Sequence, residues 1–453
     1  MFEGLFEAFR KNNKKLYHVG GSVRDVLLGR EPKDYDFTTD ALPQDTQRIL
    51  ETNGFKHWPL GEKFGTIAAF VDGMEVEITT HRKDMTAGRH PEVSFTTNLK
   101  TDLERRDFTI NSIAMDEKGS LIDPFNGAKD LANRLIKTTG SPASRFGEDP
   151  LRMLRAVRFV SQLGFNLHKH TKSILCSFAH AIMSVSRERW LEEMNKLLLG
   201  QHAVKGLELL YQTRLLGYIL PELFPITLKS DGNLPSKDLW LHTKKVVGGT
   251  SSRLNLRWAA LLHDVAKPQT RFEDKREVHF FQHEYLGAEI VQGLTRRLKM
   301  SNEQSSAIIG LVALHQRIGD IVTRRNDPPV SKNALRRLVR DCEERHCSID
   351  DLIDLFAADC SSKKKSIQER QQAHARLLKE ALGNMREEDL RPKLPKGVGE
   401  RIMKRFEVSP GPKVGIIKDR LDQMLLDGQI TTQMSIDEML SKLETEYGEE
   451  LCI

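Results

Sequence analysis

The chain has 453 residues. It contains 69 lysines and arginines and 63 aspartates and glutamates, so its net charge is mildly positive, which neither requires nor excludes a nucleic-acid partner. Its length allows roughly two to four domains, and 39% hydrophobic residues fit a globular protein. No apolar run is as long as a membrane-spanning helix, no signal-peptide pattern opens the chain, and five scattered cysteines indicate free thiols, so we expect a cytoplasmic protein without a membrane partner.

The N-terminal part is predicted to alternate helices and strands. Its apolar residues recur in some segments at the spacing of a helix face and in others at every second position, as in a strand. Helices are expected over 3–15, 23–28 and 41–51, and strands over 16–19 and 35–38. The runs GTIAAFVDG and MEVEITTHR predict two further strands that meet at Asp72-Gly73, a typical hairpin turn.

Two carboxylates, Asp34 and Asp36, carry the strongest chemical signal. They are two residues apart, so they project from the same side of an extended strand. Their mutual repulsion favours a bound cation, and oxygen ligands suit Mg²⁺, which bridges to substrate phosphates. Glu77 faces away from the apolar side of its strand and is a candidate third carboxylate; a surface position is the equally good alternative. The pattern predicts a two-ion Mg²⁺ site for nucleotidyl transfer.

Two motifs beside these carboxylates could hold the phosphates of a nucleotide. Gly20 and Gly21 would let the backbone approach a phosphate closely, and Arg24 follows in the next helical turn. The motif RRDFTIN contributes Arg106, a bidentate donor for phosphate oxygens, and Asn111 as a further nucleotide-binding residue. The alternative is a solvated basic start of a helix.

A polar loop at 82–95, which contains Gly88 and Pro91, is expected to be mobile. Downstream, EDPLRMLRAVRF predicts one helix with a polar residue at every third position. Neighbours in such a row form an inclined ridge, and a carboxylate beside a guanidinium can bind base edges, including the amines of cytosine and adenine. The alternative is a set of helical salt bridges. The row consists of Asp149 and Arg152 for the base, and Arg155 and Arg158 for the triphosphate.

From about residue 201 the chain is expected to be helical, with a boundary near 220–238. Histidines and aspartates in this part could bind a transition metal, and the alternative is a helical scaffold with core histidines. The candidate ligands are His242, His263, Asp264 and Asp359, with His283 and His315 also in plausible positions. The charged segment 361–380 is expected to be a solvated or tRNA-facing surface. In the basic segment 391–430, Gly411 and Gly415 flank a helix start whose N-terminus could receive an RNA phosphate.

Several ordered motifs resemble one family. GGSVRDVLLGREPKDYDF is similar to the signature of class II tRNA nucleotidyltransferases and bacterial poly(A) polymerases, which are polymerase-β-like nucleotidyltransferases. WAALLHDVAKP resembles the HD phosphohydrolase domain. The resemblance to the nucleotidyltransferases continues in RRDFTINSIAMD (105–116), DPFNGAKDL (123–131), EDPLRMLRAVRF (148–159) and RERWLEEMNKLL (187–198).

The resemblance implies an α+β fold: a nucleotidyltransferase head with a small mixed or antiparallel sheet, an all-α neck, an HD-like body and a helical tail. It also implies that Asp149 and Arg152 act as a protein template for CTP and ATP, that Arg106 binds the incoming nucleotide, and that 187–198 braces the template helix. The four expected regions are 1–140, 141–225, 235–365 and 366–453.

The implied activity is Mg²⁺-dependent addition of CCA, or of its CC part, to the 3′ end of tRNA, with contacts to the acceptor arm. Family members carry an acidic residue where this chain has Ala87, and a short loop is associated with enzymes that add only the two cytidines. That departure leaves CC-only addition open. The alternatives are a poly(A) polymerase, or an additional metal-dependent phosphohydrolase activity of the HD part.

Overall fold

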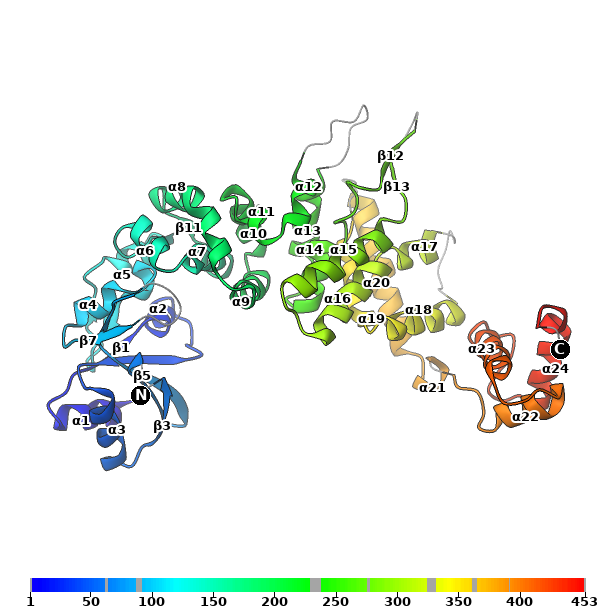
Figure 1. Cartoon of the computed structure of the whole chain (residues 1–453), viewed down its shortest axis with the longest axis horizontal. Coiled ribbons are helices and arrows are strands. Elements are labelled where there is room, and N and C mark those ends of the chain that lie inside the picture. Colours follow the sequence, from blue (N-terminus) through cyan, green and yellow to red (C-terminus); the bar gives the residue numbers. More distant parts are fainter. Residues whose placement is uncertain are drawn as a thin grey trace. The chain divides into compact units, whose positions relative to one another are not determined.

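The computed structural model describes residues 2–61, 64–86, 92–228, 238–274, 278–323, 331–360, 365–390 and 392–451. The chain divides into two compact units, residues 1–224 and 225–453, which are treated separately below (Figure 1). Within the described ranges, every helix is too short or too polar to span a membrane. The expected finer division into four regions stays a prediction.

A seven-stranded sheet lies at the centre of the N-terminal half of the first unit. Its order is β3-β4-β5-β2-β1-β8-β9, in which β2 and β5 run parallel and the other neighbours antiparallel. This confirms the expected small mixed sheet. The strands are β1 (Leu16–Val19), β2 (Tyr35–Thr39), β3 (Lys56–Gly61), β4 (Thr66–Val71), β5 (Met74–Thr80), β8 (Ala114–Met115) and β9 (Leu121–Ile122).

The β4–β5 hairpin turns at the expected residues. Asp72 and Gly73 have φ angles of 50° and 82°, which is the pair of positive values that a tight hairpin turn requires. The parallel pairing of β2 and β5 then places Asp36 opposite Glu77. The register therefore brings two of the three expected carboxylates to adjacent strands.

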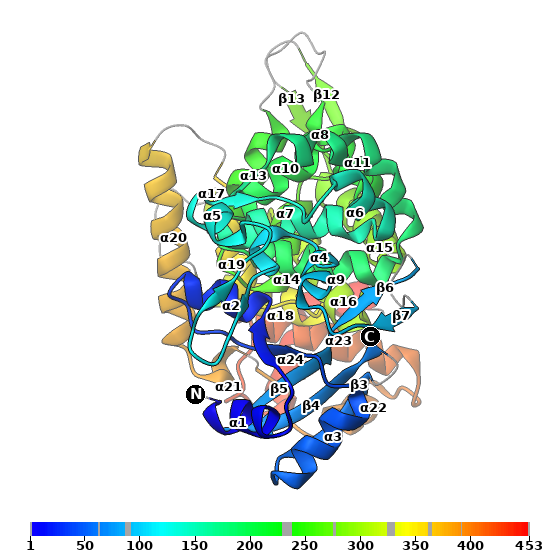
Figure 2. The ribbon, with the colours of Figure 1, turned by 90° about the vertical axis from the view of Figure 1, so that its left-hand side faces the viewer.

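Helices α1 (Glu3–Lys11) and α3 (Pro43–Thr52) pack against each other and against this sheet, α1 beside β1 and α3 beside β3–β5 (Figure 2). Their apolar sides join alternate strand residues, such as Phe37 and Ile78, in one buried core. Helix α1 ends earlier than the expected residue 15, because Asn13 adopts a left-handed conformation with φ 54°. The opposite face of the sheet receives the segments that build the candidate site.

Most of the remaining first unit is helical. Helix α7 packs against α9 and α10, and this confirms that 187–198 braces the helix of the polar row. Two pairs of short strands, β6 (Arg82–Asp84) with β7 (Val93–Phe95) and β10 (Leu135–Ile136) with β11 (Asn166–Leu167), complete the unit. The other helices are α2 (Gly21–Leu27), α4 (Leu99–Glu104), η2 (Thr109–Asn111), α5 (Gly127–Ala132), α6 (Pro142–Glu148), α7 (Leu151–Leu163), α8 (Lys169–Phe178), η3 (Ala179–Ser184), α9 (Arg187–Leu198), α10 (Ala203–Gln212), α11 (Leu215–Ile219) and η4 (Pro221–Leu223).

Two expectations for this unit need correction. The predicted loop at 82–95 contains the paired strands β6 and β7, whereas Ala87, Gly88 and Pro91 lie outside the described residues. The single helix predicted over 148–159 is interrupted at Asp149, whose φ of −145° and ψ of 102° are extended. The residue before a proline disfavours the helical conformation, so Pro150 starts a new helix.

The second unit is almost wholly helical. Helix α14 packs against α13, α16 and α19, and α22–α24 form a separate apolar cluster (Figure 1). The hairpin β12 (Arg271–Glu273) and β13 (Val278–Phe280) joins α14 to α15. The helices are α12 (Phe224–Thr227), α13 (Leu239–Gly249), α14 (Leu254–Leu262), α15 (His283–Arg297), α16 (Asn302–Leu314), α17 (Arg317–Thr323), α18 (Lys332–Glu344), α19 (Ile349–Ala358), α20 (Lys365–Gly383), α21 (Glu387–Leu390), α22 (Val398–Phe406), α23 (Pro412–Leu426) and α24 (Ile436–Leu451).

Candidate functional site

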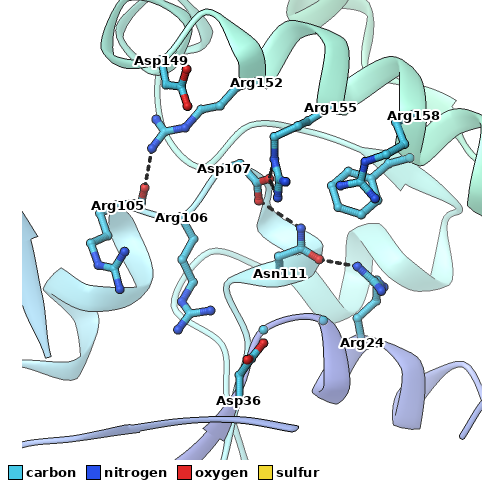
Figure 3. A pocket seen from close by; sticks show the side chains of 13 residues that line it. Arg24, Asp36, Arg105, Arg106, Asp107, Asn111, Asp149, Arg152, Arg155 and Arg158 are labelled. Atoms are coloured by element: carbon cyan, nitrogen blue, oxygen red, sulfur yellow. Dashed lines mark hydrogen bonds and ion pairs between the residues drawn. The ribbon is translucent and has the colours of Figure 1, made fainter. Parts of the chain in front are cut away.

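A cavity of about 430 Å³ opens between the sheet, the RRDFTIN segment and helix α7 of the first unit (Figure 3). Six arginines and three aspartates contribute to its wall, so its charge is strongly positive. Such a wall suits a polyanionic ligand. The lining residues are Gly20, Gly21, Arg24, Asp36, Arg105, Arg106, Asp107, Asn111, Asp149, Arg152, Arg155, Arg158 and Phe159.

Gly20 allows Arg106 and Asp36 to approach the backbone at one end of the cavity. Its φ of 79° is rarely adopted by other residues, and an added Cβ would lie 2.9 Å from Nη1 of Arg106 and 3.2 Å from Oδ2 of Asp36. Figure 3 shows the Arg106 side chain extending toward Asp36. The glycine is therefore required by both conformation and space, and its expected approach to a phosphate stays a prediction.

The three candidate carboxylates are not equivalent. Asp36 is half-buried in β2 and lines the cavity, whereas Asp34 precedes the strand and is exposed. Burial raises the pKa of Asp36, Arg106 lowers it, and Asp34 raises it again. Partial desolvation also raises the pKa of Glu77, and the charges of Asp36 and Asp34 raise it further. The three groups therefore share one region of negative potential, which is the environment that favours a cation.

Asp102 anchors the two arginines that follow α4. It is fully buried and receives contacts of 2.9 Å from Arg105 and 3.4 Å from Arg106. Burial raises the pKa of Asp102, but the two guanidinium groups outweigh burial and lower it to about 2. Asp102 therefore stays ionised and holds both arginines at the rim of the cavity.

A chain of hydrogen bonds crosses the floor of the cavity (Figure 3). Arg24 donates to Oδ1 of Asn111 at 2.8 Å, and the Asn111 amide donates to Asp107 at 3.0 Å. Asp107 also accepts two hydrogen bonds from Arg155, at 2.9 and 2.7 Å. Although burial raises the pKa of Asp107, Arg155 and Asn111 lower it to about 2. The chain links α2 and η2 to helix α7.

Glu193 of α9 extends this chain into the neighbouring helix. It is buried and accepts a hydrogen bond of 2.5 Å from Arg158, and it lies 3.5 Å from Arg155. The Arg158 guanidinium is also 4.0 Å from the centre of the Phe159 ring. Arg155 and Arg158 were expected to face a triphosphate; both line the cavity, but their charges are largely balanced by carboxylates.

Asp149 and Arg152 lie at the other end of the cavity from Asp36. Arg189 of α9 forms an ion pair of 2.8 Å with Asp149, and Arg152 donates to Glu148 and to the carbonyl of Arg105. Arg105, Asp149 and Arg152 also line a second cavity of about 580 Å³, which extends beneath β6. The two base-reading candidates thus form part of the wall between two cavities.

Sequence reasoning identified the arginines that line the cavity but not the residues that pair with them. Asp107 lies within RRDFTIN, but local spacing predicts no partner for it. Arg189 and Glu193 lie within 187–198, which is expected only to brace the template helix. Phe159 follows directly after Arg158, and an aromatic residue in a row of arginines is a usable signal for cation–π contacts. Contacts between residues that are 35 to 48 positions apart cannot be read from local spacing.

The four candidate ligands in the second unit come together in its core. Nε2 of His242 lies 3.2 Å from Nε2 of His263 and 3.0 Å from Oδ1 of Asp359. Oδ2 of Asp264 lies 3.3 Å from Nε2 of His263. Burial lowers the pKa of His263, but Asp264 and Asp359 outweigh burial and raise it to about 10. Within the described ranges, a second cluster joins Asp264 to His283 and His315.

Three families match consecutive parts of the chain. Residues 16–137 match the "Poly A polymerase head domain". This range includes the cavity-lining residues from Gly20 to Asn111. Residues 164–226 match the "Probable RNA and SrmB- binding site of polymerase A", and 241–359 match the "HD domain". The four candidate metal ligands fall within the last match.

About half of the chain is similar in sequence to curated CCA-adding enzymes. The chain is 43% identical over 225 residues to the CCA-adding enzyme of Anoxybacillus flavithermus, covering 48% of this chain and 55% of that protein. It is 44% identical over 219 residues to the CCA-adding enzyme of Geobacillus kaustophilus, covering 48% and 53%. The chain spans about half the length of the curated relatives it matches.

The fold resembles a solved structure over nearly its whole length. This is the crystal structure of the Bacillus stearothermophilus CCA-adding enzyme in complex with CTP, with a TM-score of 0.71 and 27% identity. The match covers 99% of this chain and 98% of that chain.

Proposed function

We propose that this chain is a nucleotidyltransferase that adds nucleotides to the 3′ end of tRNA without a nucleic-acid template. The match of residues 16–137 to the poly A polymerase head domain supports the proposal. The substrates are CTP and ATP, the product end is CCA or its CC part, and the reaction takes place in the cytoplasm. The likeness to CCA-adding enzymes, one of them with CTP bound, supports this assignment.

The observation that carries the proposal is the composition of the 430 Å³ cavity. One end holds Asp36 beside Arg106, and the other holds Asp149 and Arg152. Carboxylates at one end suit the reacting phosphate, and a carboxylate–guanidinium pair at the other suits the edge of a base. A single nucleotide could therefore occupy the cavity with its phosphates and base held by different groups.

Arg106 is the best placed group to bind the triphosphate. Its Nε is buried without a hydrogen-bond partner among the described residues, and its contact with Asp102 is long, at 3.4 Å. Arg24 sits beside it, held by Asn111 and Asp25. In this proposal Arg106 neutralises the phosphates, whereas Arg155 and Arg158, which are paired with Asp107 and Glu193, keep the wall of the cavity rigid.

The carboxylates fit Mg²⁺, because Asp34, Asp36 and Glu77 supply the hard oxygen ligands that this ion prefers and because burial and the charge of Asp34 both raise the pKa of Asp36 and of Glu77. Asp34 and Asp36 would hold it, with Glu77 beside them. When bound, the metal would stabilise negative charge on the reacting phosphate and favour attack by the RNA 3′-hydroxyl. Gly20 and Arg106 would hold the triphosphate in line with that hydroxyl.

Asp149→Asn is expected to change the choice of base. An aspartate accepts from the amines of cytosine and adenine, whereas an asparagine can also donate to the carbonyl of uracil or guanine. The preference for CTP over UTP is therefore expected to fall by about 5- to 150-fold, the equivalent of one good base contact at 1–3 kcal/mol. The ratio of kcat/KM values for the two nucleotides measures it.

The matched control is Glu104→Gln, which removes the same charge from a residue that lines only the second cavity. It is expected to leave the CTP-to-UTP ratio unchanged. If both variants shift the ratio equally, or neither does, Asp149 does not read the base.

Gly20→Ala is expected to lower both stability and activity. The backbone conformation costs about 1–3 kcal/mol with a side chain, and the new Cβ would also displace Arg106. Gly29→Ala is the control, because Gly29 has a φ of 68° with no atom within 4 Å of an added Cβ. We expect similar melting temperatures for the two variants but at least about tenfold slower CMP incorporation for Gly20→Ala alone. Equal activities would refute the steric argument.

Incorporation into defined RNAs tests the overall function. Transcripts of tRNA ending before CCA or after CC, and an unrelated RNA, would each receive CTP, ATP or both. Addition restricted to tRNA supports the proposal: a stop after two cytidines identifies CC addition, and completion identifies CCA addition. Long adenosine tails on any RNA would favour a poly(A) polymerase instead.

A second candidate function is hydrolysis of phosphoesters in the second unit. The gathering of His242, His263, Asp264 and Asp359 in a buried core favours it, because imidazole and carboxylate ligands suit a transition metal. Release of phosphate from a nucleotide by an Asp34→Asn/Asp36→Asn variant would support it, since that variant lacks the carboxylates of the head.

A further inference from the structure

We propose that Cys342 and Cys347 are the site of a reversible disulfide, formed by exchange with a low-molecular-weight disulfide, that stiffens the corner between helices α18 and α19. The corner consists of residues 345–348, between the end of α18 at Glu344 and the start of α19 at Ile349. The inference goes beyond the proposed function, and its test uses neither a nucleotide nor a metal.

The backbone at the end of α18 brings the two cysteines together. The amide of Cys347 donates to the carbonyl of Cys342 at 2.9 Å. One residue earlier, His346 has a left-handed φ of 54° and donates from its amide to the carbonyl of Glu343 at 3.1 Å. Two nested hydrogen bonds of this kind place the side chains of the first and last residues beside each other, usually as an apolar contact. Here both positions hold a thiol.

The outer hydrogen bond limits the separation of the two Cα atoms. With standard bond lengths, an N···O distance of 2.9 Å holds the Cα atoms of Cys342 and Cys347 within about 6.8 Å of each other. Disulfides bridge Cα atoms that are about 4.4–6.8 Å apart. Both thiols are free, and the Cys342 thiol donates a hydrogen bond to the Cys347 sulfur. The backbone therefore already has a separation that a disulfide can bridge.

The two thiols differ in a way that suits exchange. Cys347 is half-buried, whereas Cys342 is only 2% exposed. The hydrogen bond from Cys342 lowers the pKa of Cys347, burial raises it, and the charge of Arg345 lowers it again, so that the pKa lies below its ordinary value. The same hydrogen bond raises the pKa of Cys342, and burial adds to that rise. Because the thiolate is the attacking form, Cys347 is the nucleophile and Cys342 the resolving thiol.

The exchange takes place in two steps. The Cys347 thiolate attacks one sulfur of the external disulfide, whose S–S bond breaks and releases one thiolate. The Cys342 thiol then gives its proton to solvent and attacks the Cys347 sulfur of the mixed disulfide, which releases the second thiolate. The two protein thiols lose two electrons and two protons, and the external disulfide takes up the same number and leaves as two thiols.

The corner lies directly on a neighbouring helix, so a cross-link there would stiffen a packed junction. A Cβ added to Gly310 of α16 would lie 2.5 Å from the carbonyl oxygen of Arg345 and 3.0 Å from Cβ of Cys347. Gly310 thus allows the corner to lie against α16. Ser348, the next residue, caps α19 by accepting a hydrogen bond from the amide of Asp351. The disulfide would hold the place where three helices meet.

A metal ion suits this pair of thiols less well than a disulfide. Within the part of the chain that the structure describes, no third histidine, cysteine or carboxylate joins the two thiols in a group that could hold an ion. Two sulfurs alone supply half of the usual four ligands of a structural zinc site. A reversible disulfide needs only the two.

Peptide mapping in glutathione buffers tests the inference. The full chain would be equilibrated with reduced or oxidised glutathione, quenched with acid, alkylated and digested with trypsin, which cuts after Arg345 and separates 341–345 from 346–363. We expect a disulfide to link the two peptides in oxidised glutathione, with at least about tenfold less of the linked form in reduced glutathione. In the linked chain, amide hydrogen exchange over 345–348 is expected to slow by about tenfold or more.

The matched control is Cys360→Ser, because Cys360 lies in the same tryptic peptide as Cys347. This variant is expected to keep the link, whereas Cys347→Ser and Cys342→Ser are each expected to lose it. In concentrated urea the corner is lost, so the linked fraction at an intermediate glutathione ratio is expected to fall. Absence of the link in oxidised glutathione, a link to Cys360 instead, or an equal linked fraction in urea would overturn the inference. Unchanged hydrogen exchange in the linked chain would overturn the stiffening of the corner.

Discussion

Asp36→Asn is expected to abolish nucleotide incorporation while leaving the fold intact. Asparagine has nearly the same shape, so the packing of β2 is kept, but it removes the negative charge that faces the cavity beside Arg106. Loss of a group that holds the reacting phosphate and its metal lowers the rate by at least about 10³-fold. Incorporation of labelled CMP into tRNA lacking CCA measures the effect, and circular dichroism verifies folding.

Two further variants compare a candidate metal ligand, Asp34, with a carboxylate that is not one, Glu75. Asp34→Ala is also expected to stop incorporation with folding intact, although its side chain is exposed, because Asp34 shares the negative region around Asp36. Glu75→Gln is the control, since it removes a charge from the same strand as Glu77 at a residue that is not a candidate metal ligand and does not line the cavity. Unchanged activity of the Asp34 or Asp36 variant would reject the metal site in the head.

Glu193→Ala is expected to destabilise the first unit more than any other single substitution considered. It leaves the buried Arg158 guanidinium without its carboxylate, and breaking a buried pair in this way costs about 3–5 kcal/mol. For a unit of this size, such a loss lowers the melting temperature by about 6 °C or more. Calorimetry of the full chain would record the transition of the first unit.

The stability experiment has two controls. Glu192→Ala removes an exposed carboxylate from the next position of α9 and is expected to change the melting temperature by little. The double variant Arg158→Leu/Glu193→Leu removes both charges, and it is expected to recover much of the lost stability because no buried charge is left alone. A double variant as unstable as Glu193→Ala would show that packing, and not the unpaired charge, causes the loss.

The parts of the fold with strong local signals were predictable. Strand β1 begins and ends at the expected residues, and the β4–β5 hairpin turns at Asp72-Gly73 because the alternation and the turn signal agree. Strand β3 was missed, since KHWPLG contains a proline and lacks alternation, and its place depends on pairing with β4. The two-residue strands β8 and β9 are too short to carry any periodicity.

The candidate site was predictable in its residues but not in its contacts. Spacing and the resemblance to a known family together pointed to Asp36, Arg106 and the polar row from Asp149 to Arg158, and these residues line the cavity. Local spacing could not indicate that Arg155 forms an ion pair with Asp107 or that Arg158 forms one with Glu193, since both carboxylates come from other elements. Nor could it indicate that Asp149 stands ahead of the helix and pairs with Arg189, because that depends on how α9 packs.

The buried pairs of Asp107 and Glu193 have a consequence for ionic strength. Dissolved salt screens exposed charges at distances near 10 Å or more but hardly reaches pairs inside a protein. Arg155 and Arg158 therefore keep their positions in concentrated salt, and the wall that they support keeps its shape. Added salt would weaken the proposed nucleotide binding mainly through Arg106, which faces the open cavity. Affinity for a nucleotide would therefore fall at salt concentrations that leave the fold intact.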